Sequence, residues 1–355
     1  MGSFFTSKQI TTIIVAVAVI FVVLGGLTVL IEISDDDKPA VSDQSGQLDK
    51  QDGGNDAGYK FDIKSEGVDD EEPAAPDEVK VKDPLERDPY EELEELIGLE
   101  SVKDEVRSLA NYVKVQKQRE AKGLKNPKLS YHLVFTGSPG TGKTTVARIV
   151  ARIYKDLGIL KKGHLVETDR SGLIGRYVGQ TAPRVNAMCD SALGGVLFID
   201  EAYALTQKGE GDYGDEAVAA LLKRMEDDRD RLVVIVAGYT NEMKKFIDSN
   251  PGLESRFNHY IFFPDYSDGE LYDIFFMYLR KNQYSVSKEA AEYLKTKLAE
   301  VVKKKDPNFG NARYVRNLFE RTIQAHANRL AQLKGEASVE DLTFIKREDI
   351  RKAMK

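Results

Sequence analysis

The sequence predicts an α/β fold in which a parallel sheet wrapped by helices is followed by a smaller helical domain. Short apolar runs alternate with helical patterns, and these runs lie near Leu133, Leu165, Val196, Val234 and Ile261. Such alternation is typical of parallel strands joined by crossover helices. After Asp265 the pattern is helical, over residues 271–279, 288–303 and 313–330. We therefore expect an α/β domain over residues 89–265 and a helical lid over residues 266–355.

An uncharged apolar stretch, Ile10 to Ile31, follows a short N-terminal tail of residues 1–9. A helix of about 22 residues is roughly 33 Å long, which is enough to cross the core of a bilayer. The apolar core of a signal peptide is shorter, about 7–15 residues, and ends at a small-residue cleavage site that Gly25-Gly26 matches poorly. We expect an uncleaved transmembrane helix over residues 10–31, with a signal peptide as the less favoured alternative.

Residues 32–88 form an acidic segment that is rich in Asp, Gly, Pro, Ser and Gln and contains isolated apolar residues without a period. Such a segment cannot bury enough apolar surface to offset the entropy lost on ordering. We therefore expect a disordered linker, which its like charges keep extended.

Composition narrows the classes of function. The chain has 58 acidic and 51 basic residues, which does not suggest a general affinity for nucleic acid. Its single cysteine, Cys189, excludes an intramolecular disulfide and a zinc site with several cysteines. We interpret Cys189 as a small core residue rather than a reactive nucleophile.

A complete phosphate-binding loop lies between the first strand, expected over Tyr131 to Phe135, and a helix that runs from Thr145 to about Leu157. The loop reads Gly137, Ser138, Pro139, Gly140, Thr141, Gly142, Lys143 and Thr144, and Thr145 follows it. It fits G-x-x-x-x-G-K-[ST], in which glycines let backbone N–H groups surround phosphate oxygens. Lys143 would reach the β- and γ-phosphates, and the Thr144 hydroxyl would bind Mg²⁺. The loop predicts binding of a nucleoside triphosphate.

The apolar run that begins at Gly195 ends in two acidic residues, Asp200 and Glu201. The carboxyl end of a buried parallel strand is where a nucleotide binds in α/β folds. We expect Asp200 to hold Mg²⁺ and Glu201 to orient and deprotonate the attacking water.

Three later segments carry further candidates. The strand near Val234 ends at Tyr239 and Thr240, which are candidates for sensing the γ-phosphate, although an ordinary turn is as good an interpretation. Arg256 precedes the strand near Ile261 and could act on a neighbouring subunit's γ-phosphate; a surface ion pair is the alternative.

Asn311 resembles a helix N-cap. Arg313 and Arg316 lie one turn apart on the helix that follows, where nucleotide contact from the lid and simple ion pairing are both open.

From about Leu96 onward, the chain resembles AAA+ ATPases of the CbbX and stage V sporulation protein K group. The matching segments are Ile97–Lys103, Gly123–Lys125, His132–Gly137, Tyr177–Pro183, Ala237–Tyr239, Phe263–Ser267 and Gly310–Arg313. The resemblance implies a RecA-like P-loop NTPase domain, a small helical lid and a homo-oligomeric ring, which we expect to be a hexamer.

The resemblance also assigns roles to particular residues. Ile97 and Gly98 match the segment that lines the adenine pocket, and Arg313 matches the lid sensor. Arg256 matches the arginine finger, and Tyr177 matches the aromatic residue of the first pore loop, which grips a threaded polypeptide. The usual sensor Asn after the fourth strand is not matched cleanly, because Tyr239 or Thr240 stands there and Asn241 comes later.

The combined prediction is a membrane-anchored, Mg²⁺- and ATP-dependent ring that remodels or translocates a protein partner. A non-hydrolysing assembly scaffold is an alternative, which intact Glu201 and Arg256 disfavour. A nucleic-acid motor is a further alternative, but Tyr177 with Arg176 and Arg184 does not make the broad basic groove that strand binding requires.

Orientation in the membrane does not follow from charge, because Lys8 precedes the apolar stretch and Lys38 and Lys50 follow it. ATP and Mg²⁺ are abundant together in the cytoplasm, so we expect a single-pass protein with its ATPase domain there. Residues 1–6 match the N-myristoylation pattern. A myristoylated, cytoplasmic N-terminus would place the ATPase outside, so we interpret this match as coincidence.

Overall fold

The computed structural model describes residues 87–127, 130–207, 213–306, 309–333 and 335–355. These residues belong to one unit, Asp77–Lys355. The predicted tail, the predicted transmembrane helix and nearly all of the predicted linker lie outside the described residues. Within the described ranges, no helix combines the length and the apolar character that crossing a bilayer requires.

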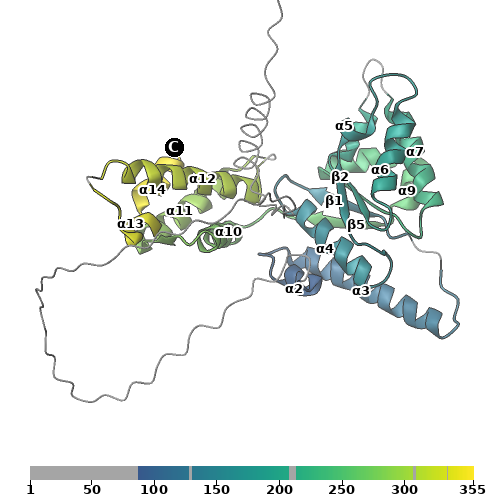
Figure 1. Ribbon diagram of the computed structural model, residues 1–355, viewed down its shortest axis with the longest axis horizontal. Helices are drawn as coiled ribbons and strands as arrows, with labels where there is room; N and C mark the ends of the chain where they lie inside the picture. The colour runs from purple at the N-terminus through teal and green to yellow at the C-terminus, as the bar shows by residue number, and fades with distance from the viewer. Residues whose placement is uncertain (1–86, 128–129, 208–212, 307–308, 334) are drawn as a thin grey trace, which may run out of the picture. The chain divides into compact units, whose positions relative to one another are not determined.

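The core of the α/β domain is a sheet of five parallel strands in the spatial order β2-β3-β4-β1-β5 (Figure 1). The strands are β1 (Leu133–Gly137), β2 (Leu165–Thr168), β3 (Val196–Ile199), β4 (Val233–Gly238) and β5 (His259–Phe263). All five predicted strands are confirmed. The first begins at Leu133, two residues later than expected, since Tyr131 and His132 lead into the sheet without joining it.

Helices cover both faces of this sheet, and successive residues of β1 pack to opposite sides, as the two-residue period of a strand requires. One face is covered by α3 (Glu100–Ala121) and α4 (Lys143–Asp156). The other is covered by α6 (Thr181–Ser191), α7 (Gly214–Asp227), α8 (Thr240–Asp248) and α9 (Pro251–Arg256). Leu133 and Phe135 belong to the cluster under α3 and α4, whereas Val134 belongs to the cluster under α6 to α9.

Three short helical segments complete the α/β domain, and they are α2 (Pro89–Glu94), α5 (Arg170–Leu173) and the 3₁₀ helix η1 (Ala202–Thr206). Cys189 on α6 is fully buried in the second cluster. Burial raises the pKa of its thiol to about 11, which fits a core residue that stays protonated.

The lid contains α10 (Asp268–Lys281), α11 (Lys288–Lys304), α12 (Asn311–Leu330), α13 (Val339–Thr343) and α14 (Arg347–Ala353). The first three confirm the predicted lid helices. A short parallel pair, β6 (Ser285–Val286) with β7 (Phe344–Ile345), was not predicted, and neither were α13 and α14. A capping box between Ser267 and Glu270 begins the lid.

The prediction that Asn311 caps α12 is wrong. The helix begins at Asn311 itself, Gly310 occupies the cap position, and no side chain caps this helix end. Asn311 is fully buried with a φ of 46°, so its amide faces inward rather than the first turn of the helix.

Candidate nucleotide-binding site

The phosphate-binding loop joins β1 to α4 and has a backbone that requires glycine. Gly140 and Gly142 have φ values of 69° and 97°, in the region that residues with a Cβ rarely adopt. A Cβ at Gly140 would lie 2.2 Å from the Gly310 carbonyl oxygen. No side chain caps α4, so its first N–H groups can donate to an anion that binds at the helix N-terminus.

Lys143 folds back onto the loop. Its Nζ donates to the carbonyl oxygens of Gly137 (2.9 Å) and Ser138 (2.8 Å). Burial lowers the pKa of Lys143, and Asp200 nearby opposes that shift. A phosphate oxygen would be a stronger, charge-assisted partner for this ammonium group than either carbonyl.

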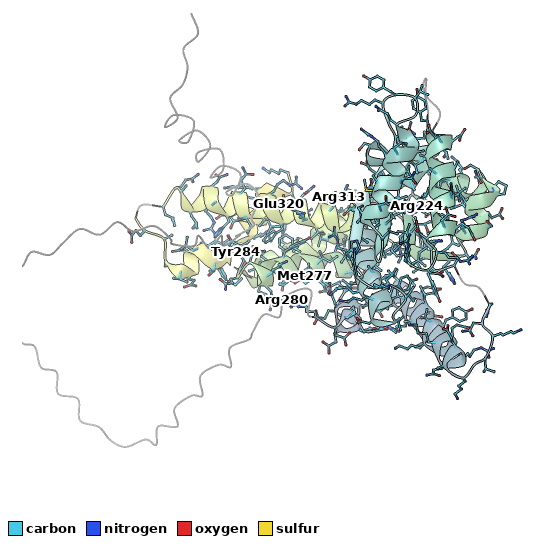
Figure 2. The ribbon with its side chains drawn as sticks, turned by 45° about the vertical axis from the view of Figure 1, so that its right-hand side comes forward. Arg224, Met277, Arg280, Tyr284, Arg313 and Glu320 are labelled. Carbon is cyan, nitrogen blue, oxygen red and sulfur yellow. The ribbon has the colours of Figure 1, made fainter. Side chains whose placement is uncertain are left out.

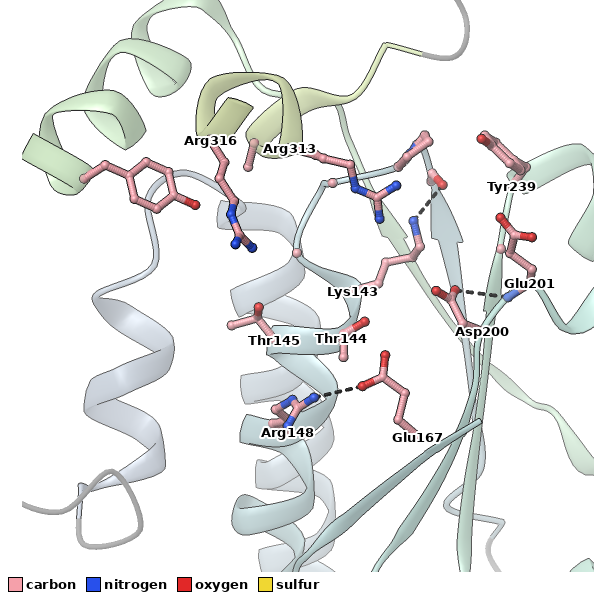
Figure 3. A pocket seen from close by; sticks show the side chains of 17 residues that line it. Lys143, Thr144, Thr145, Arg148, Glu167, Asp200, Glu201, Tyr239, Arg313 and Arg316 are labelled. Atoms are coloured by element: carbon pink, nitrogen blue, oxygen red, sulfur yellow. Dashed lines mark hydrogen bonds and ion pairs between the residues drawn. The ribbon is translucent and has the colours of Figure 1, made fainter. Parts of the chain in front are cut away.

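The two acidic residues stand at the end of β3, facing the loop (Figure 3). Glu201 has φ 48° and ψ 41°, a left-handed conformation that costs a residue other than glycine about 1–2 kcal/mol. Its backbone N–H donates to Asp200 Oδ1 at 3.0 Å. Asp200 and Glu201 line the same cleft as Lys143 and Thr144.

The oxygen atoms of Thr144 and Asp200 fit a nucleotide-bound Mg²⁺. Among the described residues there is no group of three or more His, Cys, Asp or Glu side chains that could hold a metal without other ligands. Mg²⁺ in nucleotide sites takes one or two protein oxygens and completes its shell with phosphates and water. This small donor set is therefore the kind that Mg²⁺ with a nucleotide requires.

The cleft has a volume of about 490 Å³, and the lid contributes part of its wall. Arg313 and Arg316 line it from α12 and Tyr278 from α10. In Figure 3 the Arg313 guanidinium lies across the loop toward Lys143, and Figure 2 places Arg313 at the end of the lid that meets the α/β domain. Arg316 also forms the ion pair that was its alternative, with Glu320 at 2.9 Å.

Of the three sensor candidates, Tyr239 lines the cleft. Thr240 and Asn241 begin α8 and are exposed. The geometry therefore favours Tyr239 among them.

The other loop residues take different positions at the site. Thr141 is fully buried, and its hydroxyl donates to the Ser138 carbonyl oxygen at 2.8 Å. Pro139 and Thr145 line the cleft.

Ile97 and Gly98 are not among the residues that line the cleft. Their loop lies between α2 and α3, and a Cβ at Gly98 would overlap the Glu270 side chain of the lid. The next residue, Leu99, would be 3.4 Å from a Cβ at Gly142. The loop thus reaches the junction of the phosphate-binding loop and the lid, and its role toward adenine stays a prediction.

Three residues of the cleft were not singled out in the sequence. Arg148 and Glu167 form an ion pair at 2.8 Å across the floor (Figure 3), and Tyr278 lies opposite on the lid. Arg148 lies four residues after Thr144, so helical spacing could have found it. For Glu167 and Tyr278 no local signal exists, because tertiary packing brings them to the cleft.

Arg256 is the last residue of α9 and does not line its own chain's cleft. It makes the ion pair that was the alternative interpretation, with Glu226 at 3.3 Å. Its Nε atom is buried without a hydrogen-bond partner in the described part of the chain.

Tyr177 lies on the loop before α6, with 70% of its surface exposed, and its neighbour Val178 is 83% exposed. This exposure places Tyr177 outside the hydrophobic core. Tyr177, Arg176 and Arg184 line a second cavity, which Glu201 also lines. One carboxylate therefore borders both the nucleotide cleft and the cavity beneath the exposed loop.

Comparisons with known proteins agree with this geometry. The family model described as "ATPase family associated with various cellular activities (AAA)" matches residues 133–265, and that of the AAA lid domain matches residues 267–355. Stage V sporulation protein K of Bacillus subtilis is 42% identical over 261 residues, covering 73% of this chain and 80% of the relative. Protein CbbX of Cereibacter sphaeroides is 45% identical over 264 residues, covering 74% and 85%.

A further relative is the chloroplastic ribulose bisphosphate carboxylase/oxygenase activase of Cyanidioschyzon merolae, 44% identical over 265 residues that cover 73% of this chain and 88% of the relative. Among solved structures, the FIGL-1 AAA domain in complex with ADP has a TM-score of 0.52 at 18% identity, covering 73% of this chain and 82% of that chain. This structural likeness shows the fold. The predicted resemblance is confirmed, and the chain belongs to the AAA ATPase family, in the group of stage V sporulation protein K and CbbX.

Proposed function

We propose that this ATPase assembles into a ring, in which hydrolysis of Mg²⁺-bound ATP drives the remodelling of a protein partner near a membrane. The single observation that carries the proposal is the position of Glu201, which borders both the nucleotide cleft and the cavity under the exposed Tyr177 loop. Through Glu201, the loop that holds a polypeptide at Tyr177 could change its conformation with the state of the nucleotide.

The chemistry at the cleft is attack of water on the γ-phosphate. Glu201 accepts a proton from the water, while Lys143 and Arg313 stabilise the charge that develops on the phosphate oxygens. When bound between Thr144, Asp200 and the phosphates, Mg²⁺ would neutralise part of that charge.

Support for a protein client comes from the exposed aromatic and aliphatic pair on the loop, together with the relatives. One relative is named as an activase of another enzyme. The apolar stretch over residues 10–31 supports a membrane anchor, and the need for ATP together with Mg²⁺ supports a cytoplasmic ATPase domain. Resistance to carbonate extraction, with the ATPase domain protected from protease added to intact cells, is the expected result.

The proposal is tested by trapping clients in cells. Glu201→Gln should bind ATP, release phosphate at least about 100-fold more slowly, and hold a protein partner that co-purifies. Adding Tyr177→Ala to Glu201→Gln should abolish that capture, whereas adding Tyr112→Ala, an exposed tyrosine on α3, should not. Equal capture by both double variants would contradict a role for the Tyr177 loop.

A further inference from the structure

The phosphate-binding loop turns three successive carbonyl groups toward the lid and toward Asp265 and Tyr266. These two residues belong to the segment between β5 and α10 that joins the α/β domain to the lid, here called the hinge. The Pro139 oxygen accepts from Asn311 Nδ2 (3.3 Å), and the Gly140 oxygen accepts from the Ala312 backbone N–H (3.1 Å). The Thr141 oxygen accepts from the Tyr266 hydroxyl (3.4 Å). With these carbonyls engaged on the lid side, the N–H groups of the loop are left to face an anion.

Asn311 is the residue on which this arrangement converges. Its Oδ1 accepts from the Tyr266 backbone N–H at 3.0 Å, and its Nδ2 also donates to Asp265 Oδ1 (2.9 Å) and the Phe309 oxygen (3.1 Å). One amide thus contacts the loop, the hinge at Asp265 and Tyr266, and the lid.

Few residue types can replace Asn311 at this position. The φ of 46° at Asn311 disfavours most residues, and asparagine and aspartate tolerate it best among those with a Cβ. The site needs a donor and an acceptor on one short side chain, and asparagine supplies both.

Asp265 accepts a hydrogen bond from the side-chain amide of Asn311 through an ionised carboxylate. Burial raises the pKa of Asp265, but hydrogen bonds from Lys305, Ser138 and Asn311 outweigh it, so that the pKa lies below its usual value. Lys305 Nζ lies 2.7 Å from Asp265 Oδ2. The ionised carboxylate strengthens the bond from Asn311.

We propose that Asn311 is a positioning residue that sets the conformation of the phosphate-binding loop from the lid, so that nucleotide affinity and lid position are coupled. Because coupling is reciprocal, a bound nucleotide must also restrain the hinge. The inference rests on the nucleotide site of the proposed function, and it depends neither on a ring nor on a client.

The test measures binding of a fluorescent ADP analogue to the full chain in mild detergent, without Mg²⁺. Asn311→Asp keeps the size, the left-handed backbone and the acceptor for Tyr266, but it loses the donor to Pro139 and faces Asp265 with a second carboxylate. We expect ADP affinity to fall about tenfold or more. Asn317→Asp makes the same change at an exposed position of α12 and should leave affinity unchanged.

A second variant separates positioning from folding. Asp265→Asn with Asn311→Asp exchanges donor and acceptor, which restores the bond between these two side chains and leaves the Pro139 carbonyl without its donor. We expect the melting temperature to recover relative to Asn311→Asp while ADP affinity stays low.

Recovery of both quantities would overturn the proposal, because Asn311 would then only stabilise the hinge. Tyr266→Phe removes the hydroxyl donor to Thr141 alone and should weaken ADP binding a few-fold, about 2–5-fold; unchanged binding would count against the proposal. If the wild-type chain itself bound no ADP, the nucleotide site of the proposed function would fail instead.

Discussion

His132 precedes β1 and is buried with 4% of its surface exposed. Its Nδ1 accepts a hydrogen bond from the Val234 backbone N–H at 2.9 Å, which only the neutral ring can do. Burial lowers the pKa of His132 from 6.5 to about 4, and the positive charge of Arg256 acts in the same direction. The folded protein therefore holds this imidazole neutral where the unfolded chain would protonate it.

The consequence is a loss of stability in mild acid. Between pH 6.5 and about 4 the unfolded state binds the extra proton, so the contribution of His132 is complete above pH 6.5 and lost as the pH falls toward 4. The shift corresponds to about 3 kcal/mol at most. Urea unfolding at pH 7.5 and pH 5 should show a smaller drop for His132→Gln than for wild type.

His259→Gln, on the neighbouring strand β5, is the matched control and should keep the wild-type pH dependence. Equal drops in all three proteins would mean that His132 is not the group responsible.

At the scale of single elements, the C-terminal part of the lid depends on a buried ion pair. Arg329 on α12 contacts both carboxylate oxygens of Asp349 on α14, with Nε at 3.0 and 3.2 Å and Nη2 at 3.0 Å. The Asp349 side chain is fully buried and that of Arg329 is 13% exposed. Nη2 of Arg329 also donates to the Phe344 carbonyl oxygen in β7, so the pair joins three elements.

Asp349→Ala should lower the free energy of unfolding by about 3–5 kcal/mol, because the largely buried guanidinium keeps only the more distant and half-exposed Glu348, at 3.6 Å, as a counter-charge. Asp248→Ala breaks an exposed pair with Lys244 and should cost about 0–1 kcal/mol. Replacing both partners, as in Arg329→Met with Asp349→Leu, should recover much of the loss. Chemical denaturation measures all three, and equal costs for the two single variants would contradict this account.

The same region shows where prediction from sequence ends. The strands and long helices follow from apolar periodicity, and the phosphate-binding loop, Asp200 and Glu201 follow from a local pattern. The pair β6 with β7 consists of two residues on each strand, too short for any period, and it forms because α11 and α14 pack together. The prediction that Asn311 is a cap is wrong because its contacts are with Asp265 and Pro139, which are distant in sequence.

For the whole molecule, the position of Arg256 makes a distinct prediction about assembly. This side chain does not line the cleft of its own chain, so a direct contact with the γ-phosphate would have to be made in the cleft of a neighbour. Arg256→Ala should therefore reduce hydrolysis, by roughly 10³–10⁵ as for other arginine fingers, while ADP binding persists. Arg229→Ala removes the other arginine that contacts Glu226 and should leave hydrolysis unchanged.

Mixing two inactive variants then tests the ring directly. Arg256→Ala keeps Glu201, and Glu201→Gln keeps Arg256. A junction between subunits therefore has both groups where the cleft of an Arg256→Ala subunit faces Arg256 of a Glu201→Gln subunit, and we call such a junction complete. In a ring of head-to-tail contacts, random assembly of an equal mixture makes about a quarter of the junctions complete. Phosphate release by the mixture should clearly exceed the mean of its parents. A mixture that only averages them would mean that Arg256 acts within its own chain, through Glu226, and the ring would lose its mechanistic support.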